Sequence, residues 1–95
     1  MQTITIRHGE NKLATKVFVS SEDAFNVTSV IVMGKKECIL IDCQWTRANA
    51  HRVIAEILET GLELKAIYST HAHPDHYWGM GEIHSVFPNA KCYAP

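Results

Sequence analysis

The sequence predicts an α/β fold (α+β in some schemes), in which several short strands precede a crossover helix. Before Asp42, short stretches alternate polar with apolar and partly β-branched residues, as half-buried strands do. After Asp42, one segment carries apolar residues at helical spacing, and a further short apolar run follows it. The order strand, helix, strand is typical of two parallel strands joined by a helix.

Four strands are expected in the first part of the chain, at residues 3–6, 13–19, 27–33 and 38–41. Gly9, Glu10 and Asn11 separate the first two, and the Gly-Lys-Lys segment 34–36 supplies a turn between the last two. The fourth run is continuously apolar and too short for a helix. We therefore expect a hairpin whose second strand is buried on both faces.

A helix is expected over residues 47–60, with its apolar stripe formed by Ala50, Val53, Ile54, Ile57 and Leu58. Thr46 is a candidate N-cap, and Gly61 is a candidate for the left-handed residue that closes a helix. Strand 64–69, a short helix within 77–87 and a last strand at 91–94 complete the chain. Residues 1–95 are expected to be the N-terminal portion of a single domain.

Composition limits the classes of partner. Nine basic and ten acidic residues are scattered along the chain, so no nucleic-acid partner is expected. No apolar run reaches the length of a signal peptide or a membrane span, which predicts a cytoplasmic protein that does not bind membranes. Cys38, Cys43 and Cys92 are an odd number at wide spacing, so buried free thiols are expected.

Three of the six histidines lie within residues 71–76, together with an aspartate. His71 and His73 can bind one metal ion from the same side of the loop, while Asp75 and His76 can bind a second ion. A histidine-rich loop can also be merely solvated, but four candidate ligands at this spacing outweigh that alternative. The cluster follows a predicted parallel strand, where open α/β sheets usually place their sites.

The run His71-Ala72-His73-Pro74-Asp75-His76, preceded by Ser69-Thr70 and followed by Gly79, resembles the His-x-His-x-Asp-His signature of the metallo-β-lactamase superfamily. Ile39-Leu40-Ile41-Asp42 is similar to the strand of that family that ends in an aspartate beside the metal loop. The resemblance covers the chain from about Val27 to its end. It implies a metallo-β-lactamase-like αββα sandwich, of which this chain is the N-terminal half.

The resemblance also implies the metal ligands. His71 and His73 would bind one zinc, and Asp75 and His76 a second, although iron or manganese can occupy similar ligands. Asp42 would orient the metal loop without touching metal; equally, it could simply end its strand and cap the following turn. The glycine usual after that aspartate is absent, because the chain continues Cys43-Gln44-Trp45.

The other candidate side chains have simpler interpretations. His8 and His51 are expected on the surface, and His84 on the short helix after the loop. The aromatic residues Trp45, Tyr77 and Trp78 could line a pocket, or they could be ordinary residues of the hydrophobic core and its rim. The further histidines and the bridging aspartate that the family carries in its second half are not found in residues 1–95.

The resemblance implies a zinc-dependent hydrolase acting on a small-molecule substrate. Zinc lowers the pKa of bound water to about 7, and the resulting hydroxide, oriented by Asp75, attacks an ester, thioester, lactam or similar bond. The alternative is a truncated or non-catalytic metal-binding or interaction module that lacks the remaining ligands. A nucleic-acid-processing hydrolase is disfavoured by the near-neutral charge. The 95-residue chain alone is expected to be inactive and to self-associate through the face left open.

Overall fold

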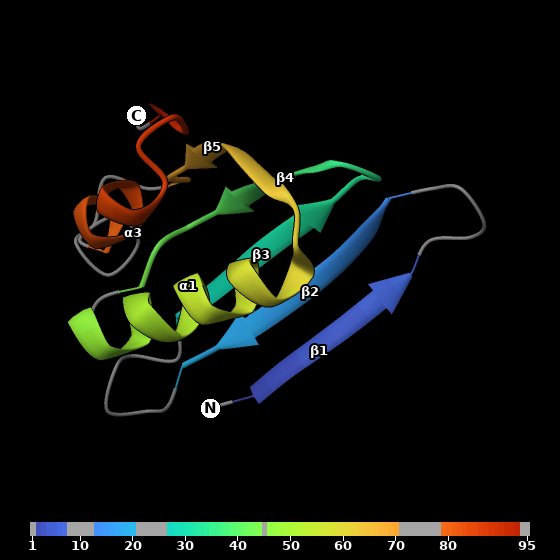
Figure 1. Cartoon of the computed structure of the whole chain (residues 1–95). Helices are drawn as coiled ribbons and strands as arrows, with labels where there is room; N and C mark the ends of the chain where they lie inside the picture. Colours follow the sequence, from blue (N-terminus) through green and yellow to red (C-terminus); the bar gives the residue numbers. More distant parts are fainter. Residues whose placement is uncertain (1, 8–12, 21–26, 45, 71–78, 94–95) are drawn as a thin grey trace.

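A computed structural model describes residues 2–7, 13–20, 27–44, 46–70 and 79–93 of the chain. The elements are β1 (Gln2–Arg7), β2 (Ala14–Val19), β3 (Thr28–Met33), β4 (Glu37–Ile41), α1 (Arg47–Thr60), β5 (Glu63–Tyr68), α3 (Met80–Val86) and β6 (Lys91–Tyr93). Among the described residues, the strands form one sheet in the order β1-β2-β3-β4-β5-β6 (Figure 1).

The sheet changes from antiparallel to parallel at β4. Strands β1 to β4 pair antiparallel, whereas β4 with β5 and β5 with β6 are parallel. A parallel neighbour requires a crossover connection, and α1 supplies it between β4 and β5. The predicted strand, helix, strand unit is therefore confirmed. Its geometry places the carboxyl ends of β4 and β5 at the same edge of the sheet.

The limits of α1 follow from local signals, and the predicted bounds are confirmed. Thr46 is the N-cap, because its hydroxyl accepts a hydrogen bond from the Asn49 backbone N–H at 3.1 Å. Gly61 adopts the left-handed conformation with φ 69°, and its N–H is bonded to the Leu58 carbonyl. The second predicted helix, 77–87, is observed as Met80–Val86, since Gly79 is its N-cap; Tyr77 and Trp78 lie outside the described residues.

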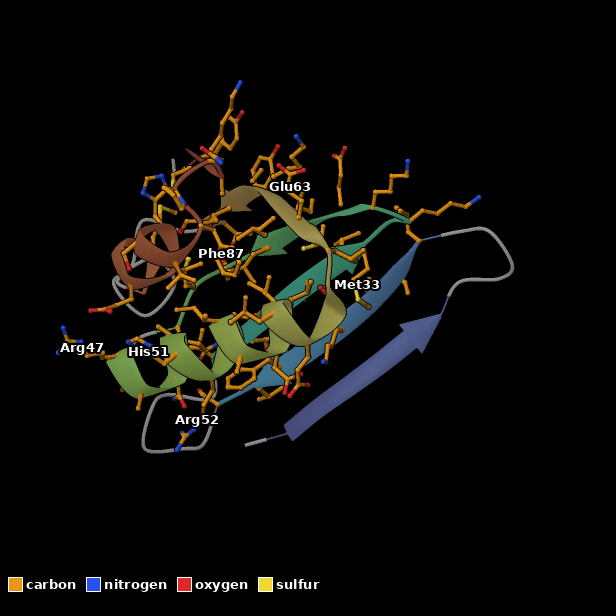
Figure 2. All side chains as sticks on the ribbon, in the orientation of Figure 1. Met33, Arg47, His51, Arg52, Glu63 and Phe87 are labelled. Carbon is orange, nitrogen blue, oxygen red and sulfur yellow. The ribbon has the colours of Figure 1, made fainter. Side chains whose placement is uncertain are left out.

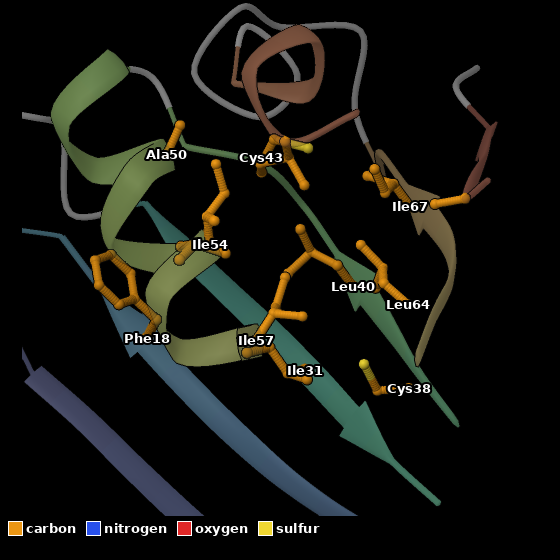
Figure 3. Packing of buried hydrophobic residues seen from close by; sticks show 13 residues of the cluster. Phe18, Ile31, Cys38, Leu40, Cys43, Ala50, Ile54, Ile57, Leu64 and Ile67 are labelled. Carbon is orange, nitrogen blue, oxygen red and sulfur yellow. The ribbon is translucent and has the colours of Figure 1, made fainter. Parts of the chain in front are cut away.

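Both helices pack on the same face of the sheet. Figure 3 shows Ile54 and Ile57 of α1 lying over Phe18, Ile31 and Leu40 of the strands. Ile83 of α3 belongs to the same buried cluster, so one core joins both helices to the sheet.

One residue of the predicted helical stripe lies outside this core. Leu58 belongs to α1 as predicted, but it is 59% exposed, so the part of the stripe that it occupies is not buried. At about 100° per residue, Leu58 lies at the margin of the stripe that Ala50 and Ile57 centre on the sheet. Position within the stripe therefore decides burial here more than side-chain type does.

The prediction that β4 is buried on both faces is wrong. Cys38 and Leu40 are buried beneath the helices, but Ile39 and Ile41 on the opposite face are only partly covered. Only the helix-covered face of the sheet has a second layer within the described part of the chain (Figure 1). A continuous apolar run therefore predicts a strand with apolar residues on both faces. It does not predict that both faces are covered by other elements.

The uncovered face carries an apolar row across five strands. The register aligns residues of β2 to β6 in the order Val17, Val30, Ile41, Tyr68 and Tyr93. The last two rings stack, with centroids 4.7 Å apart, and both remain substantially exposed. Such a row has the character of a surface suited to packing against another layer.

The cysteines have two different environments. Cys38 and Cys43 are buried and free, as expected. Burial, with smaller contributions from Asp42 and Cys92, raises the pKa of Cys43 to about 12, so this thiol is neutral and acts as a small apolar side chain. Cys92 is exposed, which corrects the expectation of burial; it lies on β6, at the end of the strand order.

An exposed ion cluster joins the helices. Arg47 Nε donates to Glu82 Oε1 at 2.9 Å, and His51 Nε2 lies 3.2 Å from Glu82 Oε2. The hydrogen bond from Arg47 is the largest influence that lowers the pKa of the Glu82 carboxyl. Figure 2 shows Arg47 and His51 at the same end of α1, and the expected surface position of His51 is confirmed.

In the described part of the chain, no helix is long and apolar enough to cross a membrane.

Candidate metal centre

The predicted ligands His71, His73, Asp75 and His76 lie outside the described residues, so their roles stay predictions. The structure describes the residues on either side of them, Thr70 and Gly79. Within the described ranges, no three His, Cys, Asp or Glu side chains are grouped to hold a metal ion. The geometry of the candidate centre is therefore built from the residues that flank the motif.

Asp42 holds the end of β5 at the point where the motif begins. Its backbone N–H donates to the Tyr68 carbonyl at 2.6 Å. Its carboxylate accepts hydrogen bonds from the Thr70 backbone N–H at 2.7 Å and from the Thr70 hydroxyl at 2.9 and 2.8 Å. Bonds to a carboxylate are stronger than those between neutral groups. The residue immediately before His71 is thus fixed to the end of the neighbouring strand.

The backbone of Asp42 allows the chain to turn at the end of β4. Its φ is 65°, the left-handed region that aspartate tolerates better than most residues other than glycine. The residue is only 8% exposed, which places Asp42 among the buried polar residues. The role predicted for Asp42, orienting the metal loop, stays a prediction. The bonds to Thr70 are the contact through which that role would operate.

Gln44 was not expected to be a structural residue. Its side chain is fully buried, and Nε2 donates to the Ser29 hydroxyl at 2.6 Å and to the Val27 carbonyl at 3.2 Å. Its Oε1 is buried and accepts no hydrogen bond from the residues that the structure describes. The sequence signal was slight: a glutamine occupies a place where the family resemblance leads one to expect glycine.

Gly79 approaches Gln44 so closely that no side chain fits. Its N–H donates to the Gln44 carbonyl oxygen at 2.8 Å. A Cβ at Gly79 would lie 2.7 Å from that oxygen and 3.1 Å from the Cβ of Ala50. Since φ is −73°, the requirement for glycine comes from this contact and not from backbone strain. The residue that precedes α3 is therefore packed directly on the connection between β4 and α1.

Replacing Gly79 by alanine is expected to lower the free energy of unfolding by about 1–3 kcal/mol, because the added methyl must displace backbone atoms. Gly81→Ala is the matched control, since nothing lies within 4 Å of its Cβ position and alanine favours helix by up to about 1 kcal/mol. Urea unfolding of the metal-free protein measures both. Equal midpoints for the two variants would contradict the proposed steric requirement.

Some of the remaining candidate residues are described by the structure and others are not. The prediction that His84 lies on the short helix is confirmed, because it belongs to α3. His8 and the aromatic residues Trp45, Tyr77 and Trp78 lie outside the described residues. A hollow of about 530 Å³ lies at the turn that joins β3 to β4, where Gly34 and Glu37 line it, at the opposite end of β4 from Asp42. It is therefore separate from the candidate metal centre.

Comparison with known sequences finds a matching family model and several similar proteins. The family model of the metallo-beta-lactamase superfamily matches residues 23–95. Glyoxylase B2 from Dictyostelium discoideum is 33% identical over 90 residues, covering 85% of this chain and 31% of that protein. A hydroxyacylglutathione hydrolase from Aliivibrio salmonicida is 32% identical over 81 residues, covering 83% of this chain and 31% of that protein. The chain spans about a third of the length of these curated relatives.

Comparison with solved structures agrees with the sequence matches. A metallo-β-lactamase from Hirschia baltica superposes with a TM-score of 0.69 at 18% identity, covering 99% of this chain and 43% of that one. The expected fold class, part of a metallo-β-lactamase-like αββα sandwich, is therefore confirmed. Because the family model matches residues 23–95, which is most of the chain, the chain belongs to the metallo-β-lactamase superfamily.

Proposed function

We propose that the protein to which this chain contributes is a zinc-dependent hydrolase with a two-metal centre. The observation that carries the proposal is the set of hydrogen bonds from Thr70 to Asp42. These bonds secure the backbone immediately before the candidate ligands, at the end of a parallel strand. Preorganised ligands are what a catalytic metal centre requires.

The candidate donors fit zinc by their chemistry. Imidazole nitrogens and carboxylate oxygens are ligands that zinc accepts, and a catalytic site keeps one position for water. His71 and His73 would hold one ion, and Asp75 with His76 would hold the second. When bound, zinc supplies Lewis acidity and makes water acidic enough to ionise near neutral pH. Iron or manganese would be accepted by a similar donor set.

Two aspartates of the chain would have further roles in the reaction. Asp75 is placed by the sequence between two histidines, where its carboxylate can orient the attacking water and accept its proton. Asp42, by holding Thr70, would keep the loop in one orientation through the reaction.

A thioester is the substrate class that the curated relatives favour. These relatives are named as a glyoxylase and a hydroxyacylglutathione hydrolase, and the second name denotes hydrolysis of an acylated glutathione. We therefore extend the proposal to a small acyl thioester as substrate. Nucleic acid is a poor candidate, because the nine basic and ten acidic residues of the chain leave it nearly neutral.

The test is to measure the metal content of the full-length protein and its hydrolysis of a hydroxyacylglutathione thioester, with a β-lactam as the comparison substrate. We expect bound zinc, thioester hydrolysis that a chelator abolishes, and recovery when zinc is restored. Hydrolysis that is unaffected by complete metal removal would refute zinc dependence. A protein that neither binds metal nor hydrolyses either substrate would support the alternative of a non-catalytic interaction module.

A further inference from the structure

The connection between β4 and α1 contacts both residues that flank the candidate metal loop. Asp42 accepts hydrogen bonds from Thr70, which directly precedes the loop. The Gln44 carbonyl accepts the N–H of Gly79, which directly follows it, at 2.8 Å. The four candidate ligands lie in sequence between these two contacts. The two ends of the loop are thus attached to positions only two residues apart.

Gln44 is itself secured from the other side. Its amide nitrogen donates to the Ser29 hydroxyl and to the Val27 carbonyl at the start of β3. That start is fixed in turn, because Ser20 exchanges hydrogen bonds with Val27 through its backbone N–H and its hydroxyl. The Gln44 carbonyl therefore has its position set by β3 as well as by its own chain neighbours.

The energetics do not favour a purely stabilising role for this side chain. Gln44 is 0% exposed, and its Oε1 has no hydrogen-bond partner among the residues that the structure describes, so none of these residues replaces the hydrogen bonds that this oxygen makes to water in the unfolded chain. The penalty for such an acceptor is comparable in size to the gain from two ordinary hydrogen bonds. The net contribution of the amide to the free energy of folding is therefore small. Its contacts instead hold the backbone at Gln44 in one position.

We propose that Gln44 is a positioning residue for the metal loop, acting through Gly79. The buried amide holds the Gln44 carbonyl, and that carbonyl sets the place where the loop ends and α3 begins. Together with Asp42, it fixes the separation between the two ends of the loop. The inference rests on the proposed function, since it assumes that the residues between Thr70 and Gly79 bind zinc.

The test compares variants of the full-length protein for zinc affinity, measured by competition with a chelator. Gln44→Met keeps a similar volume, removes the hydrogen bonds to Ser29 and Val27, and also removes the buried Oε1. We expect zinc affinity to fall by about 10–100-fold, the usual effect of losing a partner that orients ligands. We also expect a changed visible spectrum of the cobalt(II)-substituted protein and a melting midpoint of the metal-free form within a few degrees of the parent's.

Two further variants make the result specific. Ser29→Ala removes the partner of the amide and should reproduce the loss of affinity, with little additional effect when combined with Gln44→Met. It also serves as the test if Gln44→Met does not fold. Thr60→Val is the matched control, because it removes partly buried hydrogen bonds to Ile57 and Leu62 at the far end of α1. It should lower the midpoint and leave zinc affinity unchanged.

The outcomes separate this inference from the function on which it rests. If the parent binds zinc and the Gln44 and Ser29 variants keep its affinity and cobalt spectrum, the positioning role is refuted while the proposed function stands. If the parent binds no zinc, the proposed function fails and the inference fails with it. An affinity loss in Thr60→Val equal to that in Gln44→Met would also overturn the inference, since the effect would then be general destabilisation.

Discussion

Replacing His73 by alanine in the full-length protein is expected to abolish most hydrolysis and to lower the zinc content at the same time. A catalytic zinc generally needs three protein ligands, so the loss of one imidazole weakens the site directly. Metal ions supply several kcal/mol of transition-state stabilisation, and each factor of ten in rate corresponds to about 1.4 kcal/mol. The expected loss of kcat/KM is therefore on the order of 10³-fold.

The measurements are steady-state thioester hydrolysis, metal content and far-ultraviolet circular dichroism. The dichroism should not change, because ligation and not packing is the role proposed for His73. His84→Ala is the matched control: it makes the same substitution on α3, beyond the loop, and should leave activity and zinc content intact. Unchanged zinc stoichiometry together with unchanged turnover in His73→Ala would refute the ligand assignment.

The elements that the sequence predicted well are those determined by neighbouring residues. The bounds of α1 were predictable because Thr46 can cap, Gly61 can adopt positive φ, and the apolar stripe lies between them. The strands were located to within about two residues for the same reason, since alternation and turn residues are local. Parallel pairing of β4 with β5 followed from the intervening helix.

The features that the sequence did not predict depend on contacts between distant segments. Ile39 and Ile41 are partly uncovered because no second layer lies over their face in the described part of the chain, and alternation cannot show which faces are covered. Cys92 is exposed on β6, which ends the sheet order in the described part of the chain, and that position is a property of the topology. Such outcomes require the packing of the whole domain, which no window of neighbouring residues contains.

In the candidate site, too, local features were predictable from the sequence and contacts between distant residues were not. The placement of Asp42 at the end of a strand, beside the end of the next parallel strand, was predictable from the sequence. Its bonds to Thr70 were not, because they join residues that are 28 positions apart in the sequence. Gln44 was missed entirely, since a single glutamine gives no periodic signal of burial. The ligand assignments from His71 to His76 remain predictions.

The polypeptide of residues 1–95, produced alone, is expected to show no hydrolysis and to bind zinc loosely. The sequence offers two candidate ligands for each of the two proposed ions, whereas a catalytic zinc generally needs three. The Asp42 and Gln44 contacts can orient the loop, but they cannot supply the missing donors. A second copy could bring more ligands only through a symmetric interface that joins two such loops.

The uncovered sheet face determines the state in which this polypeptide would be found. Its row from Val17 to Tyr93 is apolar, and exposed apolar surface of this kind favours association. We therefore expect self-association in sedimentation experiments, through this face, before any saturation with zinc. Calorimetric zinc titration and a thioester assay, with the full-length protein as the positive control, complete the test. Tight stoichiometric zinc binding with measurable turnover by a monomer would contradict the ligand count and show that the 95 residues complete their own site.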